Sequence, residues 1–395
     1  MSTIPQRLLP RLRQLPPPAT AFLKPTMSNR NLSTSPPSQA CKPSSLTTSS
    51  SSAIPNTSIR IFRTLPSLRH WRRTQRDAHR TIGLVPTMGA LHSGHLSLIR
   101  QAASETSAVV VSIYVNPAQF GVHEDLASYP QTWDSDCALL RDLDRELAED
   151  GGNLGTVAAV FAPTDRTMYP SGFPGQEVDA KGSFVSITPA GEKLEGVQRP
   201  TFFRGVATVC MKLFNIVTPE KVYFGQKDVQ QTVVIRKMVK DFCMDTEVRV
   251  GATVREKDGL AMSSRNVYLG TRRRARATVL SSALKIAEAR WKSGVRTRAE
   301  ILGPAEEYVR DIQESEAAKP ANQRVKFEIG YLSLADPETL EEVEVVEEGR
   351  GAVLSGAFKM LPVEEAGEGE DRGLSGGPAV RLIDNIILEP VVEEA

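Results

Sequence analysis

Four short, uninterrupted apolar runs constrain the fold of this chain more than any other feature. They are TIGLVP (81–86), SAVVVSIYV (107–115), VAAVFAP (157–163) and KVYFG (221–225). Apolar runs without polar alternation are typical of strands buried on both faces, as in a parallel sheet. Residues 204–217 and 229–242 have the apolar spacing of helices instead. Strands alternating with helices predict right-handed crossovers and an α/β, Rossmann-like doubly wound parallel sheet.

The last third of the chain has a different pattern. Residues 272–294 and 299–317 have helical spacing, whereas 325–336, 351–359 and 379–388 are typical of antiparallel strands. We therefore expect a smaller C-terminal α+β domain. The expected boundaries are 58–253 for the Rossmann-like domain and 254–395 for the smaller one. Residues 144–156 and 362–379 are interpreted as insertions, and the acidic, glycine-rich second one as a solvated loop.

The first 57 residues are rich in Ser, Thr and Pro, and no Asp or Glu occurs before Asp77. Such a segment predicts a disordered tail. Its arginines make it a candidate transit peptide, so we expect a cytoplasmic protein, or a mitochondrial one if the tail is an address. Twelve of the 48 Lys and Arg precede Asp77, which leaves 36 basic against 47 acidic residues and a formal charge of −11. This acidic remainder argues against a general nucleic-acid binder.

Two of the five histidines, His92 and His95, flank Gly94 where the first predicted strand gives way to a helix. Ligands of open α/β sheets bind outside the carboxyl ends of the strands, and a helix N-terminus there favours phosphate. Two imidazoles could donate hydrogen bonds to phosphate oxygens, and Gly94 would allow close approach to the backbone. Surface helix-start residues are an equally good interpretation of these four residues alone. Metal binding is less favoured, because no carboxylate or further histidine lies nearby in sequence.

Two later segments carry groups suited to a nucleotide. In FGQKDVQQ (224–231), Gly225 would permit a tight turn, Lys227 could reach phosphate oxygens, and Asp228 could accept from ribose hydroxyls. In DGLAMSSRN (258–266), Arg265 could clamp a phosphate in a bidentate manner while two serine hydroxyls donate to it. Each segment alone is weak evidence, because glycine–lysine turns and Ser-Ser-Arg loops are common on protein surfaces. Together with the paired histidines they indicate an ATP site.

With these segments in this order, the chain resembles the pantothenate synthetases (pantoate–β-alanine ligases), of the adenylate-forming nucleotidyltransferase superfamily. The resemblance covers roughly residues 59–388. The matching blocks are VPTMGALHSGH, SIYVNPAQF, DLASYPQTWDSD, MYPSGF, LEGVQRP, FRGVATV, YFGQKDVQQ, VREKDGLAMSSRN and RLIDN. Nine blocks in order are far more specific than one motif.

The resemblance implies a two-step reaction. ATP and (R)-pantoate would give pantoyl adenylate and pyrophosphate, and β-alanine would then displace AMP to give pantothenate, the precursor of coenzyme A. His95 matches the family's proton donor, although we expect both histidines mainly to stabilise phosphate charge, together with Lys227 and Arg265. Gln119 would bind pantoate beside the β-alanine site, and Gln231 would hold pantoate. The implied ATP site comprises Pro86, Thr87, Met88, Gly89, His92, Gly94, His95, Gly225, Lys227, Asp228, Val254, Met262, Ser263, Ser264 and Arg265.

Asp136 matches a carboxylate associated with the Mg²⁺ on ATP, with Asp134 a less certain neighbour. The resemblance also implies a homodimer without nucleic-acid or membrane partners. Phe202 departs from the family, where histidine is common, so any ligand contact from this position is in question. Three alternatives stay open: a cytidylyl- or adenylyltransferase, which would not need the two glutamine blocks; a class I aminoacyl-tRNA synthetase; and a non-catalytic scaffold.

Overall fold

The larger of two sheets has seven strands in the order β1-β2-β5-β4-β3-β6-β7 in the computed structural model, which describes residues 52–122, 124–150 and 152–390. β1 and β2 pair antiparallel, and all other neighbours are parallel. The strands are β1 (Ser52–Ala53), β2 (Arg60–Phe62), β3 (Ile82–Thr87), β4 (Ala108–Ile113), β5 (Thr156–Phe161), β6 (Lys221–Gly225) and β7 (Glu247–Gly251). The four apolar runs form β3 to β6, which confirms the predicted α/β class.

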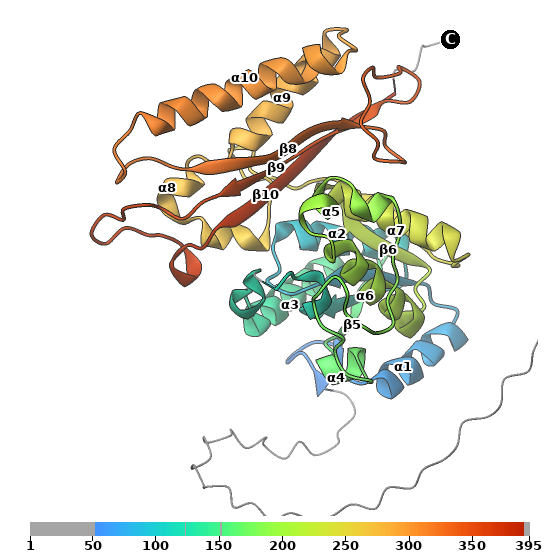
Figure 1. The fold of residues 1–395 in the computed structure, drawn as a ribbon. Helices are drawn as coiled ribbons and strands as arrows, with labels where there is room; N and C mark the ends of the chain where they lie inside the picture. The colour runs from blue at the N-terminus through green and yellow to red at the C-terminus, as the bar shows by residue number, and fades with distance from the viewer. Residues whose placement is uncertain (1–51, 123, 151, 391–395) are drawn as a thin grey trace, which may run out of the picture. The chain divides into compact units, whose positions relative to one another are not determined.

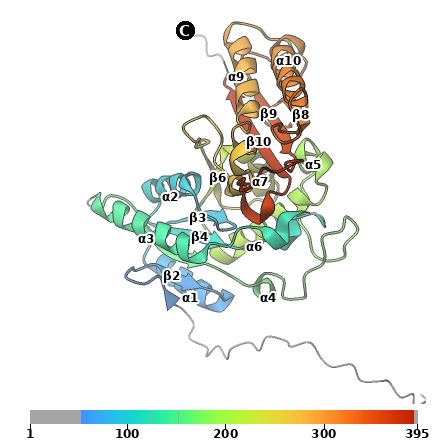
Figure 2. The ribbon, with the colours of Figure 1, turned by 90° about the vertical axis from the view of Figure 1, so that its left-hand side faces the viewer.

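Helices cover both faces of this sheet (Figures 1 and 2). On one face, α2 (Ser93–Glu105) and α3 (Trp133–Glu149) bury Ile99 and Leu140 against the strands. On the other face lie α1 (Leu65–Asp77), α6 (Phe202–Val217) and α7 (Val229–Asp241). Alternate strand residues supply the two cores, as strands buried on both faces require.

The chain reverses its direction of winding between β3 and β6. β3 leads through α2 to β4 on one side, whereas β6 leads through α7 to β7 on the other. Such a switch point opens a crevice at the carboxyl ends of the two strands, and this crevice is the usual ligand site of doubly wound sheets. We therefore expect a ligand site beside Thr87 and Gly225, the last residues of β3 and β6.

The smaller sheet is antiparallel, in the order β10-β9-β8. Its strands are β8 (Phe327–Ala335), β9 (Ala352–Met360) and β10 (Val380–Leu388), close to the predicted ranges. α9 (Val279–Lys292) and α10 (Arg298–Ala317) pack on the sheet face away from the larger sheet (Figure 1). One helix was predicted over 272–294, but the chain forms α8 (Gly270–Arg274) and α9 with a break between them.

The remaining elements are short. They are α4 (Asp165–Met168), α5 (Glu195–Gln198) and the 3₁₀ turns η1 (Pro117–Gln119), η2 (Asp125–Ser128), η3 (Ala190–Glu192), η4 (Gln226–Asp228), η5 (Ser264–Tyr268) and η6 (Leu374–Gly376). The proposed division into an N-terminal lobe (58–253) and a C-terminal lobe (254–395) places six strands of the larger sheet, β2 to β7, in the first part and the smaller sheet in the second.

We predicted that the disordered tail extends to residue 57, and for residues 52–57 this prediction is wrong. Ser52 and Ala53 pair with β2, and the side chain of Ile54 is buried in the core. This short hairpin gives Ile54 a place to bury its apolar surface, and ordered structure therefore begins before residue 58. Residues 1–51, where the rest of the predicted tail and transit peptide falls, lie outside the described residues.

The two segments interpreted as insertions differ from each other in structure. Residues 144–149 form the last turns of α3, where Leu147 is buried, and only the link to β5 is irregular. Residues 362–379 form a loop that the buried Arg273 anchors, because its guanidinium donates to the carbonyl oxygens of Pro378, at 2.6 Å, and Arg372, at 3.1 Å. The second segment is therefore less freely solvated than we expected.

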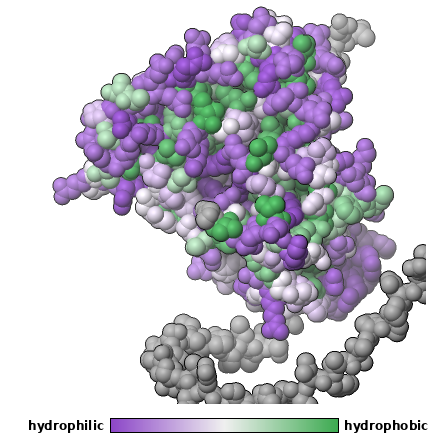
Figure 3. All heavy atoms as spheres, in the orientation of Figure 1, coloured by the Kyte–Doolittle hydropathy of each residue, from purple (hydrophilic) through white to green (hydrophobic). Residues whose placement is uncertain are grey.

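The surface carries no large apolar region on the face drawn in Figure 3, where hydrophobic residues form several small groups among polar ones. Within residues 52–390, apart from positions 123 and 151, no helix is long and apolar enough to cross a membrane.

Candidate active site

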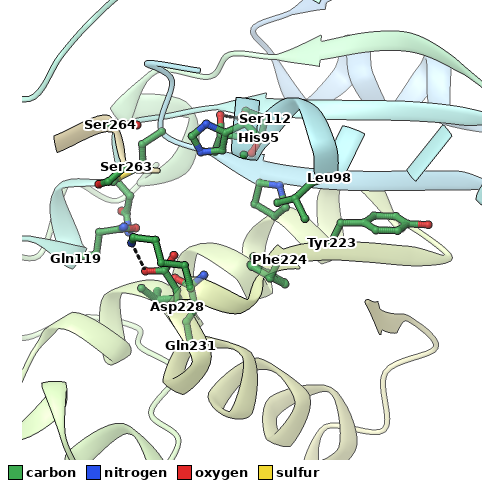
Figure 4. Close-up of a pocket in the computed structure, with 18 of the residues that line it drawn as sticks. His95, Leu98, Ser112, Gln119, Tyr223, Phe224, Asp228, Gln231, Ser263 and Ser264 are labelled. Atoms are coloured by element: carbon green, nitrogen blue, oxygen red, sulfur yellow. Dashed lines mark hydrogen bonds and ion pairs between the residues drawn. The ribbon is translucent and has the colours of Figure 1, made fainter. Parts of the chain in front are cut away.

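One pocket lies at the carboxyl ends of β3 and β6, and both lobes contribute to its walls (Figure 4). In this view His95 and Ser112 lie on one side of the pocket and Asp228 and Gln231 on the other. The structure brings together nearly all residues predicted for the site. Those that line the pocket are Pro86, Thr87, Met88, His92, Gly94, His95, Gln119, Gly225, Lys227, Asp228, Gln231, Val254, Met262, Ser263, Ser264 and Arg265. Gly89 and Asp136 are not among the lining residues.

His92 and His95 form a capping box at the start of α2. His92 is the N-cap residue, and its Nδ1 accepts a hydrogen bond from the backbone N–H of Gly94 at 3.1 Å. The backbone N–H of His92 in turn donates to Nδ1 of His95 at 3.4 Å. Because a neutral imidazole carries one N–H, both rings must hold their proton on Nε2. The helix start thus gives each histidine one N–H donor for a ligand.

Burial keeps both imidazoles neutral. It lowers the pKa of His92 to about 4, with Lys227 adding to the effect, and it lowers the pKa of His95 to about 3, with His92 and Lys227 adding to it. The two ring centroids are 4.1 Å apart, so two imidazolium charges would also repel each other. At neutral pH these side chains are uncharged hydrogen-bond donors.

Glycine has different roles at positions 94 and 225 from those we predicted. A Cβ atom at Gly94 would lie 2.9 Å from the His92 ring, so the capping box itself requires glycine there. Gly225 has extended backbone with φ −80°, and a Cβ atom there would meet no other atom within 4 Å. Gly225 is therefore not needed for a tight turn; instead, the absent side chain leaves open space beside the pocket.

The turn between β3 and α2 is held from outside by Asp136. This buried carboxylate accepts hydrogen bonds from the backbone N–H groups of Ala90, at 3.0 Å, and Leu91, at 2.8 Å, and from the Thr132 hydroxyl, at 3.0 Å. Gly89 and Ala90 both have positive φ, of 82° and 49°, so this turn needs such support. Asp136 thus acts on the backbone of the turn.

The C-terminal lobe closes the pocket over the same turn. The hydroxyl of Ser264 donates to the carbonyl oxygen of Ala90 at 2.9 Å, and Ser93 contacts the sulfur of Met262. The Ser263 hydroxyl accepts from the backbone N–H of Arg265, which caps η5. The Ser264 hydroxyl, predicted to donate to phosphate, therefore donates to a protein carbonyl in this structure, whereas the Ser263 hydroxyl acts as an acceptor and keeps its O–H for a ligand.

Arg265 also differs from its predicted state. Its Nε and Nη2 atoms pair with the two carboxylate oxygens of Asp125, each at 2.9 Å. The bidentate face of the guanidinium, expected to clamp a phosphate, is thus occupied by η2. The pair could not be read from sequence, because its partners lie 140 residues apart.

Gln119, in η1, was predicted to bind the acid substrate, and its side chain amide is held by a residue that the sequence did not indicate. Asn116 donates from Nδ2 to Oε1 of Gln119 at 3.1 Å, and Asn116 is 1% exposed. The block SIYVNPAQF contains Asn116, but nothing in the pattern separates it from an ordinary turn asparagine. Gln231, on α7, lines the pocket on the side where Asp228 lies (Figure 4).

Comparisons with known proteins agree with this geometry. The family model described as pantoate-beta-alanine ligase matches residues 60–387. The chain belongs to the pantoate-beta-alanine ligase family. It is 44% identical to a pantothenate synthetase of Chloroflexus aggregans over 80% of this chain and 96% of that protein. It is 40% identical to the pantoate–beta-alanine ligase of Saccharomyces cerevisiae, over 84% of this chain and all of that protein.

Solved structures of the pantoate-beta-alanine ligase family share the fold. A pantothenate synthetase from Thermus thermophilus is 36% identical, with a TM-score of 0.64 over 82% of this chain and 98% of that one. A pantoate-beta-alanine ligase from Francisella tularensis, described as complexed with beta-gamma ATP and beta-alanine, is 27% identical with a TM-score of 0.53. This match covers 84% of this chain and 99% of that one.

Phe202, which departs from the family pattern, lines the pocket at the start of α6. The Arg199 guanidinium lies 3.8 Å from the centroid of its ring, and Arg199 also pairs with Glu124. A guanidinium stacked on an aromatic face in this way is a favourable cation–π arrangement. Phe202 thus contributes an apolar wall to the pocket, and its ring stacks against Arg199. A histidine at this position would add a polar group instead.

Asp136 does not fit the role of a Mg²⁺ ligand that the family resemblance implied. Its carboxylate already accepts three hydrogen bonds from protein donors and lies behind the turn. We therefore assign Asp136 to the turn and not to a metal ion.

Proposed function

We propose that this enzyme condenses (R)-pantoate with β-alanine at the expense of ATP, through pantoyl adenylate, as the last step of pantothenate synthesis. The observation that carries the proposal is the pairing, in one pocket, of two neutral histidine donors at a helix N-terminus with amide side chains on the opposite wall. The first group suits the phosphates of ATP and the second suits a small hydroxy acid.

In the first step, a carboxylate oxygen of pantoate attacks the α-phosphorus of ATP, and the bond from that phosphorus to the bridging oxygen of pyrophosphate breaks. Negative charge develops on the leaving pyrophosphate. Nε2–H of His92 and His95 and the ammonium of Lys227 are donors aimed at such charge. With a pKa of about 3, His95 acts through a hydrogen bond and keeps its proton.

In the second step, the neutral amine of β-alanine attacks the acyl carbon of pantoyl adenylate, AMP leaves with the electron pair of the broken C–O bond, and the new amide nitrogen loses one proton to solvent. This step needs the two reactants held in line more than it needs further charge stabilisation. Gln119, which would hold the acid beside the entering amine, supplies that positioning. Gln231 would also hold the acid, with Met88 and Phe202 among the apolar residues that line the pocket.

Whether Arg265 can bind a phosphate depends on its ion pair with Asp125. To contact a phosphate by its bidentate face, its guanidinium must leave Asp125, or a phosphate must use the remaining Nη1. Mg²⁺ would accompany ATP, with phosphate oxygens of the nucleotide as its ligands. A homodimer, which rests on the family resemblance, is a further part of the proposal, as is a cytoplasmic location, or a mitochondrial one if the N-terminal tail is a transit peptide.

Isotope exchange between pyrophosphate and ATP tests the proposed function. The purified chain is incubated with ATP, Mg²⁺ and labelled pyrophosphate, together with pantoate or one of a panel of other small acids. We expect label to enter ATP only with pantoate and without tRNA, and AMP to form in proportion to pantothenate once β-alanine is added. Exchange with a different acid, or a requirement for tRNA, would contradict the proposal.

A further inference from the structure

Tyr169, the residue after α4, places its hydroxyl behind the acid-binding side of the pocket. It is 5% exposed, and its hydroxyl lies 2.6 Å from Oδ1 of Asn116. Tyr169 is not among the residues that line the pocket, and so far it has no part in the site. The question is what a buried hydroxyl does at this position.

The orientation of the Asn116 amide is decided by backbone groups that cannot exchange their roles. The carbonyl oxygen of Gly205 can only accept, and it lies 3.2 Å from Nδ2. The N–H of Ala118 can only donate, and it lies 3.4 Å from Oδ1. The Tyr169 hydroxyl must therefore be the donor to Oδ1, and at 2.6 Å it is the closer of the two donors.

The same reasoning carries over to Gln119. Because Nδ2 of Asn116 donates to it, the atom of Gln119 that faces Asn116 is Oε1. The Nε2 group is then left for the pocket. Among the residues that the structure describes, Nε2 of Gln119 makes no hydrogen bond. Gln119 thus presents two N–H donors to whatever binds beside it.

We propose that Tyr169 is a positioning residue for the acid substrate, acting through Asn116 to keep the Nε2–H groups of Gln119 turned toward the pocket. The inference rests on the proposed function in one respect, the assignment of Gln119 to pantoate. The carboxylate of pantoate is an acceptor only, so it would be repelled by Oε1 of a rotated Gln119. Orientation of this amide thus decides whether the acid is bound or rejected.

We expect the hydrogen bond from Tyr169 to Asn116 not to vary with pH near neutrality, because Tyr169 is buried. Burial raises the pKa of Tyr169, with Asp165 adding to the shift, so the hydroxyl stays protonated and remains a donor. The ammonium of Lys212 lies 3.7 Å from the centroid of the Tyr169 ring, and this contact holds the ring in place without using the hydroxyl. Tyr169→Phe therefore removes the donor and leaves the ring contacts.

The test is steady-state kinetics of Tyr169→Phe in the full chain. Loss of one hydrogen bond to a side chain amide should raise the KM for pantoate roughly 3- to 10-fold, with the KM for ATP changed less than about twofold. In a Gln119→Ala background the same substitution should change the KM for pantoate less than about twofold, because the group it positions is gone.

Tyr268→Phe is the matched control. Tyr268 is 1% exposed, and its hydroxyl donates to the carbonyl oxygen of Ser128 at 2.7 Å, outside the pocket. It measures the effect of losing a buried tyrosine hydroxyl as such, and we expect its KM for pantoate to stay near the wild-type value. If Tyr169→Phe is insoluble, Asn116→Ala replaces it as the test, because it removes the amide that donates to Gln119. It should likewise raise the KM for pantoate more than the KM for ATP.

The outcomes separate the two proposals. Absence of pantoate-dependent exchange in the wild-type enzyme would overturn the proposed function itself. If the wild type is active, the positioning role is overturned by equal increases in the KM for ATP and pantoate, by an undiminished effect of Tyr169→Phe in the Gln119→Ala background, or by an equal effect of Tyr268→Phe.

Discussion

At the scale of single residues, local surroundings decide what His92 and His95 can do. In water an imidazole is half protonated near pH 6.5 and can serve as an acid or a base. Buried against each other at the start of α2, both rings instead lose their charge and keep one N–H each. The family resemblance implied a proton donor at position 95, whereas the geometry and burial of His95 favour a hydrogen-bond donor.

This difference predicts how adenylation depends on pH. A protonated acid would make adenylation faster as the pH falls through 6.5. Because the pKa of His95 is lowered to about 3, its protonation state does not change between about pH 5 and 8, and we expect no inflection from it there. His95→Ala should slow pantoate-dependent exchange by about 10²-fold or more. Reaction of preformed pantoyl adenylate with β-alanine should be affected much less, since no pyrophosphate leaves.

Both half-reactions are measured on the same preparation, with Tyr268→Phe as a variant outside the pocket. An inflection near pH 6.5 that disappears in His95→Ala would indicate an imidazolium acid. Equal losses in the two half-reactions would indicate a role for His95 in the fold or at the amine.

At the scale of elements, the close packing of α6 on η1 determines where Gln119 lies. Gly205 is the contact point, because a Cβ atom there would lie 2.1 Å from the carbonyl oxygen of Ala118. Gly205→Ala must therefore push η1 away from α6. We expect a loss of about 1–3 kcal/mol in the free energy of unfolding and a higher KM for pantoate.

Gly303→Ala in α10 is the matched control for that substitution. It also replaces a helical glycine, but nothing lies within 4 Å of the added methyl group. Alanine there should leave the kinetics unchanged and raise stability by about 0.5–1 kcal/mol. Denaturant unfolding of the two variants provides the comparison; if Gly205→Ala were as stable as the wild type, η1 would be less tightly held than the structure indicates.

The elements that sequence predicted well are those with long apolar runs. β3 to β6 are buried on both faces, so nearly every residue in them is apolar. β7 was missed because it is a short edge strand with the polar residues Glu247 and Arg249. The β1–β2 hairpin was missed because each of its strands is too short to show a pattern.

The sequence predicted which residues line the pocket better than it predicted the hydrogen bonds and ion pairs that those residues make. Motifs carried by local segments, such as His92–His95 and Ser263–Arg265, indicated lining positions that the structure brings together. The partners of these residues come from distant parts of the chain, and no local pattern marks them. The Asp125 pair of Arg265 and the Tyr169 contact of Asn116 are of this kind.

At the scale of the whole molecule, the family match begins at residue 60 and the first described strand at Ser52. We therefore expect removal of residues 1–51 to leave kcat/KM within about twofold of the full chain, a change of well under 1 kcal/mol in the barrier. The full chain and the shortened chain are compared in the same assay. Loss of soluble, active protein on shortening would mean that the tail contributes to folding or to the site.

The C-terminal sheet also holds the turn η4, which carries Lys227 at the pocket. Asn385, in β10, donates from Nδ2 to the carbonyl oxygens of Gln226, at 2.8 Å, and Lys227, at 2.9 Å, in η4. Arg381, from the same strand, pairs with Glu195 in α5. The turn that carries Lys227 therefore takes its position from both lobes.

That shared support limits how these enzymes can be recombined. A chimera that joins the N-terminal lobe of this chain to the C-terminal lobe of a relative inherits Lys227 from one parent and its backbone anchor from the other. A chimera that kept every pocket residue would still form a distorted pocket if β10 were slightly displaced relative to η4. For protein engineering, the unit of exchange is thus β10 together with η4, a pair more than 150 residues apart in sequence.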